Sequence, residues 1–287
     1  MSDQAAKLRA LVGESSPELY ARDGGVPIVV VTGARGGVGA TSVAVNLAAV
    51  VADRGERVLL VDGAQQRNEL VETSGVRREM EYSLAEVLGG KCAIEKAIVP
   101  GPVGLQMLLN RWSARTSPDF SRNAQQRLLG ELQSLEGAVD LIVIDAGRGL
   151  TPWSRRFWSR ANLVALVTTP EDATVLDAYA IVKQGVADSA ELPLRLLVNQ
   201  AANDLEADSV HRRLDSVCQR FLSRSLPALP ALPMQVGREL GRMHVAPRVW
   251  ETPHTEFGHA ALWLGRAVRD LVGEVSCSQT ETHVALS

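Results

Sequence analysis

Residues 29–48 read VVVTGARGGVGATSVAVNLA, and this stretch decides the fold. The three valines at 29–31 form a strand-like run, a glycine-rich turn follows, and an apolar helical pattern begins at Thr41. Glycines allow backbone amides to curl around an anion, and the start of a helix adds its dipole at the same point. The stretch therefore has the features of a phosphate-binding loop.

The spacing from Gly33 approximates the Walker A nucleotide-binding pattern, with one departure. Ala40 stands where that pattern has its lysine, and Thr41 follows in the position that offers a hydroxyl to Mg²⁺. The alternative is a plain strand-turn-helix connection in which the glycines only allow a tight turn. We favour the phosphate loop because of the motifs that accompany it.

Strand-like apolar runs recur along the chain and alternate with helical patterns. Several runs are nearly continuous in Val, Ile and Leu, as in parallel strands that are covered on both faces. The alternation predicts an α/β fold with a doubly wound, mostly parallel sheet, whose ligand site lies at the carboxyl ends of the strands. The predicted strands are 27–31, 57–61, 105–109, 140–144, 163–168 and 194–198, and the predicted helices include 42–54, 124–135 and 172–187.

Composition shifts divide the chain into four parts. Residues 1–12 form a short segment of their own, and the polar stretch 13–25 (GESSPELYARDGG) is rich in helix breakers and predicts a linker. The main domain is expected over 26–275, and a polar tail over 276–287.

The whole-chain composition predicts a soluble, cytoplasmic protein. The net charge of −3 gives no general attraction to nucleic acid or anionic lipid. Three scattered cysteines without metal-ligand spacing fit a reducing compartment. The sequence has no uninterrupted apolar run of about 18 residues, and its first residues lack the apolar region of a signal peptide.

Together the motifs resemble the MinD/ParA family of deviant-Walker ATPases, over roughly residues 26 to 272. The family's loop reads K-G-G-x-G-K-T, in which the first lysine reaches across a dimer and the second grips the phosphates. Those two positions are Arg35 and Ala40 here. The resemblance implies ATP or ADP with Mg²⁺ as ligands and a homodimer as the assembly. The nucleotide-binding residues that it implies are Arg35, Gly36, Gly37, Gly39, Thr41, Ser42 and Asn199.

Three further motifs of the family lie at predicted strand ends. The strand RVLLVD ends at Asp62, which matches the first aspartate of the family's D-x-D motif, and the second aspartate, which orients the attacking water in relatives, falls on Ala64. DLIVIDAG matches the Walker B strand and implies that Asp145 holds Mg²⁺ through water. LLVNQ places Asn199 where relatives read the adenine edge. The implied metal residues are Thr41, Asp62 and Asp145.

The departures at Ala40 and Ala64 both affect catalysis. Loss of the loop lysine removes a charged hydrogen bond, which is worth roughly 1.5–3 kcal/mol. Loss of a water-orienting carboxylate typically costs about 10²- to 10⁴-fold in rate. Arg35 keeps the positive charge, but its planar fork is no simple substitute for lysine. The sequence therefore predicts a pseudo-ATPase with no intact catalytic set and with weak or absent nucleotide binding.

The segment DQAAKLR at residues 3–9 resembles the D-Q-A-x-x-L-R motif of FlhG, also called YlxH or FleN, the flagellar branch of the family. In that branch the segment activates FlhF, a signal-recognition-type GTPase that places flagella. The resemblance implies an FlhF-like partner, which is bound through Gln4, Leu8 and Arg9. A helix here is short enough to order only on its partner. The alternative is a disordered start that matches the motif by chance.

Two other stretches leave a choice open. Residues 148–160 interleave four arginines with three aromatic residues, which either bind a partner or nucleic acid, or pack inward. Residues 256–275 form an amphipathic pattern, and several relatives anchor to membranes through a C-terminal helix. Acidic residues offset its arginines, so a helix that caps the core is favoured over a membrane anchor.

The leading interpretation is a FlhG-like regulator in the cytoplasm, peripheral to the inner membrane only through a partner, with no specific nucleic-acid ligand. The main rival is a ParA-type ATPase that partitions chromosomes or plasmids, or positions other cargo. The spacing from Asp62 to Asn68 resembles the partition branch more than the cell-division branch. A third alternative is an active ATPase with unusual loop chemistry.

Overall fold

The computed structural model describes residues 25–65, 70–71, 80–110, 119–189, 191–234 and 253–284. The predicted partner-binding segment 1–12, with Gln4, Leu8 and Arg9, lies outside these residues, and so does the linker before Gly25.

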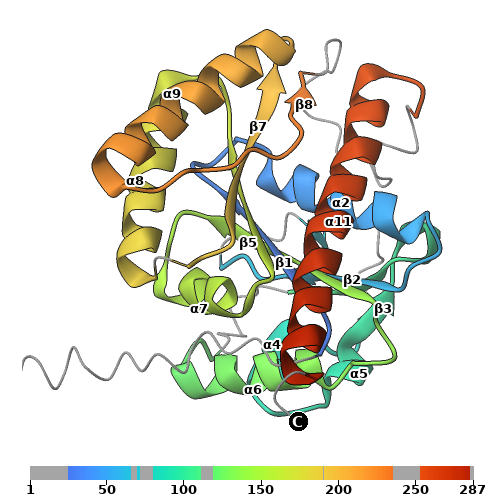
Figure 1. Ribbon diagram of the computed structural model, residues 1–287. Helices are drawn as coiled ribbons and strands as arrows, with labels where there is room; N and C mark the ends of the chain where they lie inside the picture. Colours follow the sequence, from blue (N-terminus) through green and yellow to red (C-terminus); the bar gives the residue numbers. More distant parts are fainter. Residues whose placement is uncertain are drawn as a thin grey trace, which may run out of the picture.

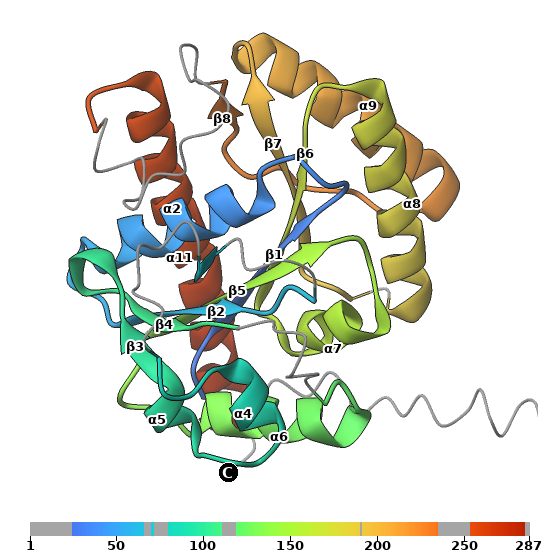
Figure 2. The same cartoon turned by 180° about the vertical axis from the view of Figure 1, so that it is seen from behind.

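The described residues form one sheet in the strand order β3-β4-β2-β5-β1-β6-β7-β8 (Figures 1 and 2). Every neighbouring pair is parallel except β3 and β4, which run antiparallel at one edge. The predicted mostly parallel α/β sheet is therefore confirmed. The strands are β1 (Ile28–Gly33), β2 (Val58–Asp62), β3 (Ile98–Pro100), β4 (Gln106–Leu108), β5 (Leu141–Arg148), β6 (Leu163–Thr168), β7 (Leu194–Ala201) and β8 (Leu232–Pro233).

Helices cover both faces of this sheet. On one face, α11 packs along α2 and reaches β6 and β8; α11 is the red helix in Figure 1. On the other face lie α7, α8 and α9, and Figure 2 shows α4, α5 and α6 together beside β3. The helices are α2 (Ala40–Ala52), α4 (Leu84–Leu88), α5 (Ile94–Ala97), the 3-10 turn η2 (Pro102–Gly104), α6 (Arg122–Gln133), α7 (Pro152–Arg160), α8 (Asp172–Asp188), α9 (Asp204–Leu222) and α11 (Glu256–Val284).

The central strand β1 shows why the apolar runs are continuous. Val29 and Val31 lie in the core beneath α2 and α11, whereas Ile28 and Val30 lie in the core beneath the opposite helices. All six residues of β1 are buried. Because successive side chains of a strand point to opposite faces, a strand covered on both sides favours apolar residues at successive positions, as at residues 28–31.

The aromatic residues of 148–160 pack inward along α7, as in the second of the two alternatives. Trp153, Phe157 and Trp158 are all buried. The indole Nε1 of Trp158 donates to Thr32 Oγ1 at 3.0 Å, and that of Trp153 donates to the Gly63 carbonyl oxygen at 2.8 Å. α7 therefore fixes the ends of β1 and β2, where the candidate site lies.

The C-terminal helix α11 caps the core, as predicted. Phe257, Leu264 and Val268 are buried against α2 and the sheet. The helix continues to Val284, into the stretch 276–287 where a tail is expected, and no glycine or proline interrupts residues 274–284. Among the residues that the structure describes, no helix has both the length and the apolar character to cross a membrane.

Arg57 and Asp140 form an ion pair just before strands β2 and β5, at the end of the sheet opposite the candidate site. Arg57 Nη2 lies 2.5 Å from Asp140 Oδ1, and the Arg57 amide donates to Asp140 Oδ2 at 2.8 Å. Hydrogen bonds from Arg57 lower the pKa of Asp140 from 3.8 to about 2. The two side chains are 49% and 35% exposed, so solvent screens much of this interaction.

We expect Asp140→Asn to lower the free energy of unfolding by no more than about 1 kcal/mol at pH 7. A depressed carboxyl pKa stabilises the fold above the unfolded pKa, and this stabilisation is lost as the pH falls through the folded pKa. The difference from wild type should therefore shrink between about pH 4 and pH 2, as urea unfolding at a series of pH values would measure. Asp208→Asn, on the exposed side of α9, is the control for removal of one charge. An unchanged difference at low pH would contradict this account.

Candidate functional site

The predicted phosphate loop connects β1 to α2. Ala34 N donates to the Val167 carbonyl oxygen at 2.8 Å, which ties the start of the loop to β6. Gly37 and Gly39 have φ of +90° and +84°, in the left-handed region that favours glycine. α2 then starts at Ala40, directly after Gly39, so the helix begins at the end of the glycine loop, where its dipole favours an anion.

Two amide side chains at the end of β7 hold this loop. Asn199 Nδ2 donates to the Val38 carbonyl oxygen at 2.8 Å, and Gln200 Nε2 contacts the Gly37 carbonyl oxygen at 3.4 Å. A Cβ at Gly39 would lie 2.5 Å from Asn199 Nδ2, so a larger residue there would displace the amide group of Asn199. Asn199, expected at the adenine edge, thus contacts the loop backbone. The sequence did not indicate Gln200, whose φ of +61° is unusual for a residue other than glycine.

The two predicted acidic residues meet beside the loop. Asp62 and Asp145 are partners in the β2–β5 register, and Asp145 is also opposite Val31 of β1. Both are 1% exposed. The Gly147 amide donates to Asp145 Oδ1 at 3.0 Å. Asp62 is the last residue of β2, Asp145 is its partner on β5, and Thr41 lies in the first turn of α2. Carboxylate and hydroxyl oxygens are the kind of donor that Mg²⁺ takes.

The side chains of Ala40 and Ala64 lie close to neighbouring backbone. Ala40 is buried, and its Cβ would lie 3.2 Å from a Cβ at Gly33. Ala64 follows β2, and its Cβ would lie 3.2 Å from a Cβ at Gly147, whose φ is +73°. Position 40 thus contributes a methyl group to the core and no charge to the loop.

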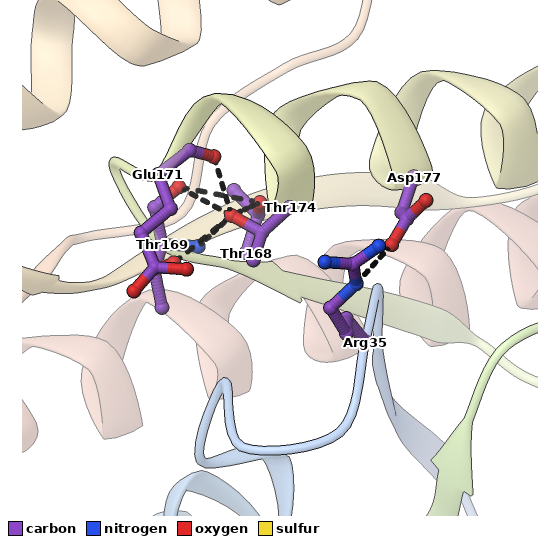
Figure 3. A network of polar contacts seen from close by, with 6 residues as sticks. All are labelled: Arg35, Thr168, Thr169, Glu171, Thr174 and Asp177. Carbon is purple, nitrogen blue, oxygen red and sulfur yellow. Dashed lines mark hydrogen bonds and ion pairs between the residues drawn. The ribbon is translucent and has the colours of Figure 1, made fainter.

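The side chain of Arg35 points away from the loop glycines and forms an ion pair with a residue of the same chain. Its Nε donates to Asp177 Oδ2 on α8 at 2.6 Å (Figure 3). A threonine cluster holds the first turn of α8: Thr174 Oγ1 donates to the carbonyl oxygens of Thr169 and Glu171 at 2.9 and 2.8 Å. These hydrogen bonds fix the junction of β6 and α8, and with it the position of Asp177 on α8. The sequence did not indicate Asp177 as a partner of Arg35.

The remaining predicted residues also lie on this loop or beside it. Gly36 and Gly37 are exposed, Ser42 is exposed in the first turn of α2, and Thr41 is half-buried next to it. The structure thus places every predicted nucleotide-binding and metal residue on the side of the sheet where the parallel strands have their carboxyl ends.

Comparison with known proteins shows which family the chain resembles. A family model described as an AAA domain matches residues 26–175. The antiactivator FleN of Pseudomonas aeruginosa is 29% identical over 72% of this chain and 74% of its own length. MinD of Bacillus subtilis, a septum site-determining protein, is 31% identical over 67% of this chain and 72% of its own. The flagellum site-determining protein YlxH of Helicobacter pylori is 27% identical over 78% of this chain and 75% of its own.

Among solved structures, MinD of Pyrococcus horikoshii OT3 in complex with Mg-ADP superposes with a TM-score of 0.69. The match covers 86% of this chain and 97% of that one at 24% identity, and it shows the shared fold. The family match spans half of the chain, and the Bacillus MinD match spans two thirds of both proteins. This chain belongs to the MinD/ParA family of P-loop ATPases.

Proposed function

We propose that this chain is a FlhG-type regulator of flagellar assembly or number that acts on an FlhF-like GTPase, with impaired or absent ATP hydrolysis of its own. The observation that carries the proposal is the segment DQAAKLR at residues 3–9, ahead of a domain similar to FleN and to the flagellum site-determining protein YlxH. GTP hydrolysis by the FlhF-like partner, measured with the full chain and with residues 1–12 deleted, tests it.

In this proposal the domain binds ATP or ADP with Mg²⁺ weakly. The support is the glycine loop, the paired carboxylates of Asp62 and Asp145, and the Mg-ADP complex of the Pyrococcus MinD. Ala40 and Ala64 are the reasons for weak binding and for the loss of hydrolysis. The protein acts in the cytoplasm and reaches the inner membrane through its partner.

The second candidate is a partition-type role on chromosome, plasmid or other cargo. It is favoured by the spacing from Asp62 to Asn68, although Asn68 lies outside the described residues. The two roles differ in genomic context, because a flagellar gene neighbourhood supports the first and a partition locus the second.

The Arg35–Asp177 ion pair leads to a prediction about assembly. In this family a lysine at the position of Arg35 reaches across the dimer to the partner's phosphates. Arg35 is paired within its own chain and Ala40 adds no charge, so we expect weak or no ATP-driven dimerisation of the wild type. Asp177→Asn should release Arg35 and strengthen the ATP response by no more than about fivefold, because an exposed ion pair is worth about 1 kcal/mol or less.

Sedimentation velocity with and without ATP measures this response. Asp188→Asn is a matched control, since it removes an ion pair with Arg155 at the other end of the same helix. Adding Arg35→Ala to Asp177→Asn should abolish the gain. Strong ATP-driven dimers in the wild type that persist in Arg35→Ala would show that Arg35 has no part in assembly.

A further inference from the structure

Arg148, the last residue of β5, lies against the phosphate loop although it belongs to no loop motif. A Cβ placed at Gly36 would lie 2.9 Å from Arg148 Nη1 and 3.6 Å from its Cδ. The guanidinium therefore lies directly beside the loop backbone. Both Gly36 and Arg148 are exposed.

The backbone around Arg148 explains how it reaches the loop. Arg148 is the register partner of Gly33, just after an irregularity in the β1–β5 ladder. The Gly149 amide donates to the Gly33 carbonyl oxygen at 2.8 Å. Gly147 and Gly149 both have left-handed φ, +73° and +71°, so the chain turns on each side of Arg148. These contacts anchor residue 148 to the point where the loop begins.

The charges around the loop show what Arg148 contributes. Position 40 carries a methyl group, and Arg35 is held by Asp177 at 2.6 Å. Arg148 brings a guanidinium to the same loop from a neighbouring strand. A guanidinium is always charged and donates two parallel hydrogen bonds to a phosphate group.

We infer that Arg148 is a phosphate-binding residue of this site and supplies the charge that Ala40 lacks. The inference rests on the proposed nucleotide binding and makes it more specific, because the ligand it implies is a nucleoside di- or triphosphate bound by a rearranged site. A charged hydrogen bond to phosphate corresponds to about a 10- to 100-fold difference in affinity.

Calorimetric titration of the full chain with MgADP and with MgATP tests this assignment. Wild type should bind, and Arg148→Gln, which keeps much of the side-chain length without the charge, should bind about 10- to 100-fold more weakly. Arg148→Ala should behave in the same way. Arg212→Ala removes an exposed arginine on α9, away from the loop, and should bind as wild type does. Circular dichroism confirms that each variant is folded.

A rescue separates charge from structural damage. Adding Ala40→Lys to Arg148→Gln returns a cation to the loop by the other route and should restore most of the lost affinity. A purely structural role of Arg148 would not be rescued in this way. If wild type binds and Arg148→Gln binds equally well, the assignment of Arg148 is overturned while the proposed function stands. If wild type binds neither nucleotide at millimolar concentration, nucleotide binding and the role of Arg148 both fall.

Discussion

The purified full-length protein is expected to hydrolyse ATP at or near the background rate, with lipid or DNA added as well as without them. The proposal assigns Ala40 to the position of the loop lysine and Ala64 to that of the carboxylate that orients water. Loss of such a carboxylate typically costs about 10²- to 10⁴-fold in rate, and the missing charge adds to this loss. Phosphate release in a coupled assay measures the rate.

Restoring both residues gives the sharper form of this prediction. Ala40→Lys with Ala64→Asp is expected to recover some turnover, whereas either change alone is not, because each leaves one part of the chemistry missing. Asp145→Ala in the double variant is the control, and it should abolish whatever turnover is recovered. A wild-type rate comparable to that of ordinary relatives, and lost in Asp145→Ala, would overturn the pseudo-ATPase proposal.

The central strands could be predicted because the sheet is covered on both faces. Each of the predicted runs at 27–31, 140–144 and 163–168 overlaps an observed strand, since burial on two sides demands apolar residues throughout. Helix α9 is not among the helices named from the sequence. It buries only Ala207, Val210, Leu214 and Cys218 among many charged residues, so its apolar stripe is narrow. The edge strands β3 and β8 are too short to show a period of their own.

Some residues of the candidate site could also be predicted from sequence, whereas the contacts between them could not. Asp62 and Asp145 could be placed from sequence because each directly follows an apolar run, and neighbouring parallel strands run in the same direction. The pairing of Arg35 with Asp177 joins residues 142 positions apart, and that of Gln200 with Gly37 joins residues 163 apart. No local pattern encodes such contacts, because they arise from the way β5, β7 and α8 pack around the loop.

The first twelve residues are expected to work without the nucleotide-binding domain. A linker of about a dozen residues is long enough for the segment to bind away from the domain. A peptide of Met1–Val12 should therefore stimulate GTP hydrolysis by the cognate FlhF-like protein, and the chain that lacks these residues should not. This would explain how the loop could lose its lysine while the protein kept a role, because another segment carries the activity.

Alanine substitutions at the three motif residues should affect different quantities, the maximal GTPase rate or the concentration needed for stimulation. Gln4→Ala and Arg9→Ala should lower the maximal GTPase rate, by about 10²-fold or more if their polar groups reach the developing charge on the phosphate. Leu8→Ala should instead raise the peptide concentration needed for half-maximal stimulation by about 10- to 100-fold, since a buried leucine is worth about 1.5–3 kcal/mol. Lys7→Ala, at a variable position of the motif, is the matched control and should leave both quantities unchanged. If the wild-type peptide at saturating concentration leaves the partner's GTP hydrolysis unchanged, the flagellar proposal loses its main support, and the partition-type role becomes the better account of this chain.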